Sequence, residues 1–249
     1  MNTLEKGLRI LTLLGEGQSE LSAADIARAL GLPRSTAYRY VAALRSHGLI
    51  EEDPHTGLLR LGPRLLQLAG SVRRKGLIEI ALPRMERLVA ATGETVILAG
   101  LHETSGICLE RVEGHHALRV SHERGAVFPL HAGATGKVLL AYLPKDDQER
   151  IIAQGLPRFT ATTITDPTAL RVELDRIRSV GYAESDGEVI PHTYGLAVPI
   201  LSGAGRILAA LGASAPSTRL GARTKKPVLN ELSTTAQAIA RELEVYNRS

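Results

Sequence analysis

Two short helical segments joined by a tight turn, within residues 21–48, constrain the fold of this chain most. Ser22 and Asp25 have the spacing of a capping box at the start of the first helix, and Gly31 suits the position just after its end. Pro33 can then occupy the first turn of the second helix. Together these signals predict a helix-turn-helix.

The second of these helices has two chemically different faces. A projection at about 100° per residue places an apolar set on the side expected to reach the core: Ala37, Tyr40, Val41 and Leu44. The opposite side offers hydroxyls and guanidinium groups but no carboxylate, which is the chemistry that contacts phosphates and base edges in DNA. The candidate DNA-contacting residues here are Arg34, Ser35, Thr36, Tyr38, Arg39 and Arg45. An ordinary solvated helix face is the alternative interpretation.

A hairpin follows this helix directly. Residues 49–52 and 58–61 are predicted to be strands, and residues 53–57, which include Pro and Gly, the turn between them. A hairpin at this place is typical of a wing. Arg60 in the second strand is a further candidate phosphate contact, or else a solvated strand residue.

Length and charge indicate that the chain has parts of different kinds. Its 249 residues exceed one typical domain of about 100 to 200 residues. Residues 1–75 hold 11 Lys and Arg against 7 Asp and Glu, which accounts for the whole net charge of +4. We predict a winged helix-turn-helix over residues 1–61, a linker helix over 62–75 with an apolar excess that suggests packing against another chain, and an α+β domain over 76–249.

The larger domain is predicted to combine an antiparallel sheet with flanking helices. A run of small residues, 133–136, opens a helix after a loop over 122–132, and Asp166 and Pro167 cap another helix that ends at Gly181. The other expected elements are helices over 78–91 and from Pro227 onward, and strands over 95–101, 107–112, 117–121, 197–201 and 207–213.

Several classes of protein are not supported by the sequence. A single cysteine, Cys108, excludes an internal disulfide, and none of the eight histidines has HExxH spacing. Nucleophile elbows, Walker loops and dinucleotide fingerprints are lacking, so we expect no enzyme, no metal site and no cofactor. No signal peptide or membrane span is recognisable, and we therefore expect a cytoplasmic protein without a membrane partner.

Several segments, in their order and spacing, resemble one family. They include Ile26-Ala27, Gly31-Leu32, Ser35-Thr36 and Arg39 within residues 21–48, Arg60-Leu61-Gly62 with the helix to Leu68, and residues 130–141, which read LHAGATGKVLLA. Gly181-Tyr182, Glu188, residues 197–200 and residues 213–216 complete the pattern. Over nearly its whole length the chain resembles the IclR family of transcription regulators.

The resemblance implies a GAF-like effector-binding domain, a homodimer formed largely through the N-terminal domains, and a tetramer built as a dimer of dimers. The implied effector is a small carboxylate or an aromatic acid. Implied pocket contacts are Val120, Phe128, Ala134, Thr135, Ser185, Asp186, Gly195, Gly212 and Ser214. Independently, free amides at the start of a helix favour an anion, although the glycines there are also explained by a tight turn.

One departure from the family pattern concerns the effector. Many members carry a Gly followed two or three residues later by an Arg-Cys or similar pair. Here residues 191–196 read PHTYGL, so His192 and Tyr194 are expected to line or cover the pocket differently. This leaves the effector's identity open. We expect a repressor whose binding to a double-stranded DNA operator is controlled by a small molecule. The alternative is an architectural DNA-binding protein whose larger domain only oligomerises.

Overall fold

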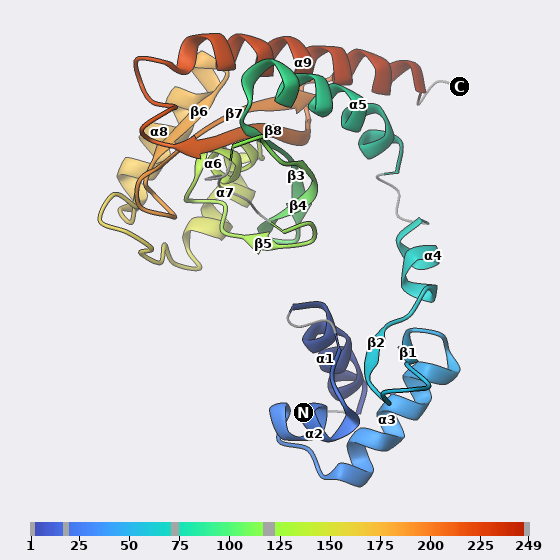
Figure 1. The fold of residues 1–249 in the computed structure, drawn as a ribbon. Coiled ribbons are helices and arrows are strands. Elements are labelled where there is room, and N and C mark those ends of the chain that lie inside the picture. Colours follow the sequence, from blue (N-terminus) through green and yellow to red (C-terminus); the bar gives the residue numbers. More distant parts are fainter. Residues whose placement is uncertain (1–2, 17–19, 71–74, 117–122, 247–249) are drawn as a thin grey trace. The chain divides into compact units, whose positions relative to one another are not determined.

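The computed structural model describes residues 3–16, 20–70, 75–116 and 123–246, drawn in Figure 1. The chain divides into two compact units, Met1–Lys75 and Gly76–Ser249. The strand expected over residues 117–121 lies outside the described residues. Along the described chain, no helix has the length and apolar character that crossing a membrane requires.

The first unit is a helix-turn-helix followed by a two-stranded hairpin (Figure 1). Its elements are α1 (Thr3–Glu16), α2 (Ala23–Ala29), α3 (Arg34–Ser46), β1 (Ile50–Glu52), β2 (Leu59–Leu61) and α4 (Arg64–Gly70). A small apolar core holds the elements from α1 to β2 together, centred on Ile10, Leu14, Ile26, Tyr40, Val41, Ile50 and Leu59. The hairpin is tied to the helices by a bridge between Leu21 and Leu59.

Local signals in the sequence set most of these boundaries. Ser22 is the N-cap of α2 and forms the expected capping box with Asp25. Gly31 has a positive φ of 62°, as its predicted place after the helix requires. Pro33 is the N-cap of α3 and not part of its first turn, so that prediction was wrong by one residue. The predicted core face of α3 is confirmed, since Ala37, Tyr40 and Val41 are buried and Leu44 is half-buried.

The second unit is an α+β domain with one antiparallel sheet, in the strand order β5-β4-β3-β8-β7-β6. Its helices are α5 (Lys75–Thr92), α6 (Ala134–Ala141), α7 (Lys145–Ile152), α8 (Pro167–Val180) and α9 (Lys225–Tyr246). Its strands are β3 (Thr95–His102), β4 (Ser105–Val112), β5 (Val127–Phe128), β6 (Ala183–Asp186), β7 (Thr193–Leu201) and β8 (Ile207–Pro216).

The two faces of this sheet carry side chains of different size. Leu196, Val198 and Leu211 point into the core beneath α5 and α9, which lie together over one face (Figure 1). Ala197 and Ala210, which alternate with them, face a second core formed with α6 and α8. The small side chains allow α6 to approach the strands closely, and the candidate site lies at the start of α6.

Some predicted elements of this unit need correction. The helix from Asp166 to Gly181 is confirmed, with Asp166 accepting from the amide of Ala169 and Gly181 in the left-handed region. The predicted loop over 122–132 contains β5, and α7 and β6 were not predicted at all. The last helix begins at Lys225, two residues before Pro227, which fits in its first turn.

Candidate functional site

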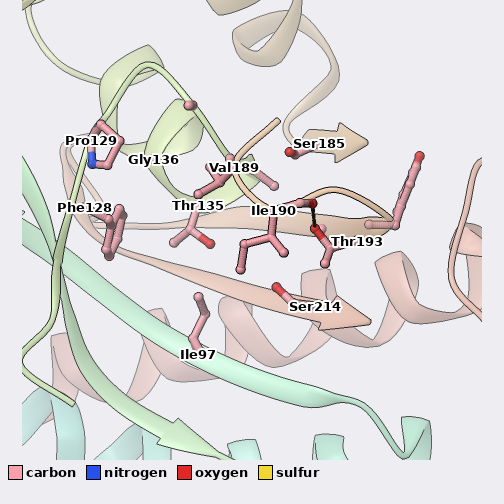
Figure 2. Close-up of a pocket in the computed structure, with 15 residues that line it drawn as sticks. Ile97, Phe128, Pro129, Thr135, Gly136, Ser185, Val189, Ile190, Thr193 and Ser214 are labelled. Carbon is pink, nitrogen blue, oxygen red and sulfur yellow. Dashed lines mark hydrogen bonds between the residues drawn. The ribbon is translucent and has the colours of Figure 1, made fainter. Parts of the chain in front are cut away.

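A cavity lies between the start of α6 and the strands beneath it, with about 580 Å³ of empty space, part of it open to solvent. Figure 2 shows that the labelled residues around it come from β3, β5, α6, β6, β7 and β8 and from the segments after β5 and before β7. Its lining combines apolar side chains, such as Ile97, Phe128 and Ile190, with a few polar groups. A mainly apolar lining with a few polar groups is typical of small-molecule sites.

Among the hydroxyl-bearing residues that line this cavity are Thr135, Ser185 and Ser214. Thr135 and Ser185 are only 8% and 7% exposed. Ser185 and Ser214 both pair in register with Gly195, one on each side, so the sheet places them together. Within the described residues none of the three hydroxyls hydrogen-bonds to another protein group. Buried hydroxyls normally have partners, so these groups are available to a ligand.

The first turn of α6 borders the same cavity. Its N-cap, Gly133, has a positive φ of 78°, and its N–H donates to Glu188 Oε2 at 3.0 Å. The amides of Ala134, Thr135 and Gly136 follow in the first turn, where an α-helix supplies no carbonyl acceptor. These amides and the helix dipole favour an anion at this end of the cavity.

A buried ion cluster joins Lys137 on α6 to the segment that carries Val189 and Ile190, which form an apolar wall of the cavity. Lys137 is 1% exposed, and its Nζ donates to Glu188 Oε1 at 2.5 Å, to Glu173 Oε1 at 3.1 Å and to the carbonyl of Glu184 at 2.9 Å. The hydroxyl of Thr163 donates to the Glu188 carbonyl at 2.7 Å. Because Glu188 precedes Val189 and Ile190 in the chain, these contacts hold that apolar wall against α6.

Four glycines lie at or just behind the cavity, and the protein itself explains three of them. Gly133 needs its positive φ, and a Cβ on Gly136 would lie 2.5 Å from the Pro129 carbonyl oxygen. A Cβ on Gly212 would lie 2.7 Å from Thr135 Oγ1. On Gly195, however, the nearest atoms would be at 3.5 to 3.9 Å, which is ordinary contact. Close approach of a ligand to the backbone is one reason for a glycine inside a strand that neither packing nor φ requires.

The structure brings together six of the nine effector contacts that the sequence suggested: Phe128, Ala134, Thr135, Ser185, Gly195 and Ser214. Two others do not line the cavity. Asp186 is exposed, with its carboxylate 3.4 Å from Ser217 Oγ, because it follows Ser185 in the strand and points away from it. Gly212 lies behind the Thr135 side chain. Val120 lies outside the described residues.

Of the two residues expected to line or cover the pocket, Tyr194 lines it and His192 does not. His192 is exposed with a positive φ of 61° and does not line the cavity. Tyr194 borders the cavity, but its ring packs in the core under α5 and α9, and its hydroxyl donates to Glu184. Burial, together with this hydrogen bond, raises the pKa of Tyr194, so its hydroxyl stays a neutral donor.

Sequence reasoning missed several lining residues: Ile97, Pro129, Ala132, Val189, Ile190 and Thr193. Strand alternation offered a signal only for Ile97, which pairs with Gly212 in the neighbouring strand. The role of Lys137 was missed as well, since its partners lie 36 to 51 positions further along the chain.

The candidate DNA-binding face of the first unit is largely exposed. Arg34, Ser35, Tyr38 and Arg39 are exposed and Thr36 is half-buried, and the Arg39 guanidinium lies 5.5 Å from the centre of the Tyr40 ring.

The other two candidate arginines are paired with carboxylates of the hairpin. Arg45 forms an ion pair with Glu52, and Arg60 with Glu51 at 3.2 Å. The candidate DNA-binding face of α3 carries no carboxylate of its own, but Glu51 and Glu52 of the wing lie close to two of the candidate arginines.

Other chemistry receives little support from the described residues. Among them, no group of three or more His, Cys, Asp or Glu is placed to hold a metal ion. His131 is buried with Nε2 at 2.9 Å from the Pro157 carbonyl, and it stacks on Phe159. Burial raises the pKa of the Cys108 thiol to about 11, which disfavours the reactive thiolate.

Comparison with known proteins matches both units. The family model described as "IclR helix-turn-helix domain" matches residues 3–54, and "Bacterial transcriptional regulator IclR C-terminal" matches residues 69–241. HTH-type transcriptional regulator BhcR of Paracoccus denitrificans (strain Pd 1222) is 35% identical over 222 residues, covering 88% of this chain and 79% of that protein. HTH-type transcriptional repressor AllR of Escherichia coli (strain K12) is 31% identical over 219 residues, covering 87% and 81%.

Solved structures agree with these matches. The IclR homologue of Microbacterium hydrocarbonoxydans, crystallised in complex with 4-hydroxybenzoate, has a TM-score of 0.88 and 32% identity, covering 98% of this chain and 100% of that one. The Thermotoga maritima IclR structure has a TM-score of 0.82 and 27% identity, covering 98% and 99%. The fold and these relatives define a helix-turn-helix transcription regulator and not an enzyme. The chain belongs to the IclR family.

Proposed function

We propose that this protein is a repressor that binds a DNA operator through α3 and the β1-β2 wing, and that a small carboxylate in the α6 cavity controls this binding. The observation that carries the proposal is the pair of buried hydroxyls, Thr135 and Ser185, which have no protein partner among the described residues and lie beside the first turn of α6. Such groups are costly to bury unless something binds them. The relative AllR is named a repressor, which supports the direction of control.

The effector we propose is an aromatic or other ring-bearing monocarboxylate. Its carboxylate would bind the amides of Ala134, Thr135 and Gly136. Its apolar body would lie between Phe128 and the wall formed by Val189 and Ile190. Gly195 has no side chain, so the space over the sheet at this position is open. We place the flat ring of the effector in this space. The 4-hydroxybenzoate bound by a structural relative is a molecule of this class.

We further propose a homodimer, able to pair into a tetramer, with contacts between the first units. Leu4 and Leu8 on α1 and Leu68 on α4 are exposed apolar side chains, which a second chain would cover. Residues 62–75 would then link effector binding to the spacing of the two α3 helices. This coupling requires the effector to bind the two arrangements with different affinity.

Ser214→Ala tests the effector site. We expect it to weaken binding of 4-hydroxybenzoate or benzoate about 2- to 12-fold, the effect of one hydrogen bond. Binding is measured as the ligand-dependent rise in the melting temperature. Ser179→Ala, at an exposed position on α8, is the matched control. Unliganded binding to DNA should not change, and loss of both activities would indicate misfolding. No shift with any ring-bearing carboxylate would favour an architectural protein.

A further inference from the structure

The wing carries an acidic run that DNA binding alone does not explain. Glu51, Glu52 and Asp53 are consecutive and make up three of the seven carboxylates in residues 1–75. Carboxylates repel phosphates, and the wing follows the proposed DNA-reading helix directly. Asp53 has a structural role, since it accepts the amides of His55 and Thr56 at 2.9 Å each and so shapes the turn. Glu51 and Glu52 have no such role.

Both of these glutamates are paired with candidate DNA-contacting arginines. Glu51 lies opposite Arg60 in the hairpin register, and its Oε2 accepts from Nε and Nη2 of Arg60 at 3.2 Å each. Glu52 accepts from Nη1 of Arg45, which extends from the last turn of α3. Each carboxylate therefore holds a guanidinium group that would otherwise be free to bind a phosphate.

The location of these pairs makes exchange with DNA possible. Arg45 and Arg60 are 53% and 50% exposed, so the pairs are solvated and weak. Arg45 and Glu52 line a groove between α3 and the wing, together with Tyr38. By contrast, no carboxylate in the described part of the chain lies within ion-pair distance of Arg34 or Arg39. Before DNA binds, Arg45 in the last turn of α3 is therefore paired with a carboxylate, whereas, among the residues described, Arg34 and Arg39 are not.

We propose that Glu51 and Glu52 lower the affinity of the protein for DNA of any sequence, because they compete with phosphates for Arg60 and Arg45. Sequence-independent binding depends almost entirely on phosphate contacts, whereas contacts from the free half of α3 to base edges do not need these arginines. The wing glutamates thus reduce binding to the excess of non-operator DNA. This inference rests on the proposed DNA-binding function.

The test measures binding of the full chain to a short fluorescent duplex of random sequence by anisotropy. We expect Glu51→Gln and Glu52→Gln each to raise the affinity about 2- to 5-fold at low salt, the range that corresponds to one exposed ion pair. The gain should shrink as salt screens the charges. Glu149→Gln is the matched control, because it removes the same charge from an exposed pair with Arg171 in the second unit.

A double-mutant cycle separates competition from general repulsion. In an Arg45→Ala background, Glu52→Gln should lose most of its effect, because no guanidinium remains to be released. Unchanged or reduced affinity of the glutamine variants overturns the inference, and a reduction would mean that the glutamates orient the arginines for DNA. If the unmodified chain binds no duplex at all, the proposed function itself fails, which is a distinct result. Circular dichroism melting confirms that each variant is folded.

Discussion

Replacing Gly195 with alanine, and in parallel Gly212 with alanine, is expected to have opposite effects on stability. A methyl group on Gly195 would lie 3.5 Å from Ala134 Cβ and 3.8 Å from Ser214 Oγ, with no clash. Alanine inside a strand is more stable than glycine by about 0.5 to 1 kcal/mol, so Gly195→Ala should stabilise the second unit by that amount. On Gly212 the methyl would meet Thr135 Oγ1 at 2.7 Å and the Leu196 carbonyl at 3.1 Å. Such overpacking costs about 1 to 3 kcal/mol.

The effect of Gly195→Ala on the ligand should run the other way. The added methyl occupies the space between the sheet and the first turn of α6, where we place the ring of the effector. We expect binding of benzoate to weaken about tenfold or more, or at least about 1.4 kcal/mol, because overpacking a filled pocket is costly. Acetate, which lacks the ring, should bind equally well to both proteins.

The assay is urea unfolding followed by circular dichroism, since the chain has no tryptophan. The transition that benzoate shifts belongs to the second unit, and its midpoint reports stability with and without ligand. If the two alanine variants change the midpoint in the same direction, the packing argument fails. If Gly195→Ala keeps full affinity for benzoate, the glycine does not make room for a ring.

Three further predictions concern the ion cluster, the DNA-reading helix and acid stability. Lys137→Met should lower the free energy of unfolding by about 3 to 5 kcal/mol, because it leaves the buried Glu188 carboxylate without its countercharge; a loss under about 1 kcal/mol in urea unfolding would contradict this. Arg39→Ala should weaken operator binding in a mobility-shift assay by about 1 to 3 kcal/mol and relax sequence preference, and unchanged binding and preference would exclude base reading by this residue. Burial works to raise the pKa of Glu184, but the bonds from Lys225 and Tyr194 outweigh it and hold the pKa below its usual 4.5. The stability that this carboxylate contributes is therefore present above pH 4.5 and is lost as the pH falls through the lowered pKa. Glu184→Gln should flatten the acid side of a plot of urea midpoint against pH. An unaltered plot would count against the pairing.

Local signals explain what the sequence predicted well. The capping box of Ser22 and Asp25, the positive φ of Gly31 and the buried face of α3 all depend on residues within one or two helical turns. The start of α6 was found for the same reason, because small residues at 133–136 mark a tight turn into a helix. Such features need no knowledge of the distant chain.

Contacts between distant segments explain what it did not predict. Val189 and Ile190 line the cavity because Glu188 reaches back 51 positions to Lys137, and no periodic pattern marks that segment. The choice between Ser185 and Asp186 needed the register of β6 against β7, since a shift of one residue reverses the face. The pairing of Arg45 with Glu52 likewise depends on how the hairpin folds against α3.

The central claim is that a ligand in the α6 cavity controls DNA binding by the first unit. The most direct measurement is an anisotropy titration of the full chain with the duplex upstream of its own gene, repeated with benzoate, 4-hydroxybenzoate and acetate. We predict tight binding without ligand, and a change in affinity with a ring-bearing acid that also stabilises the second unit but not with acetate. Affinity that stays the same in the presence of an acid that demonstrably occupies the cavity would contradict the account.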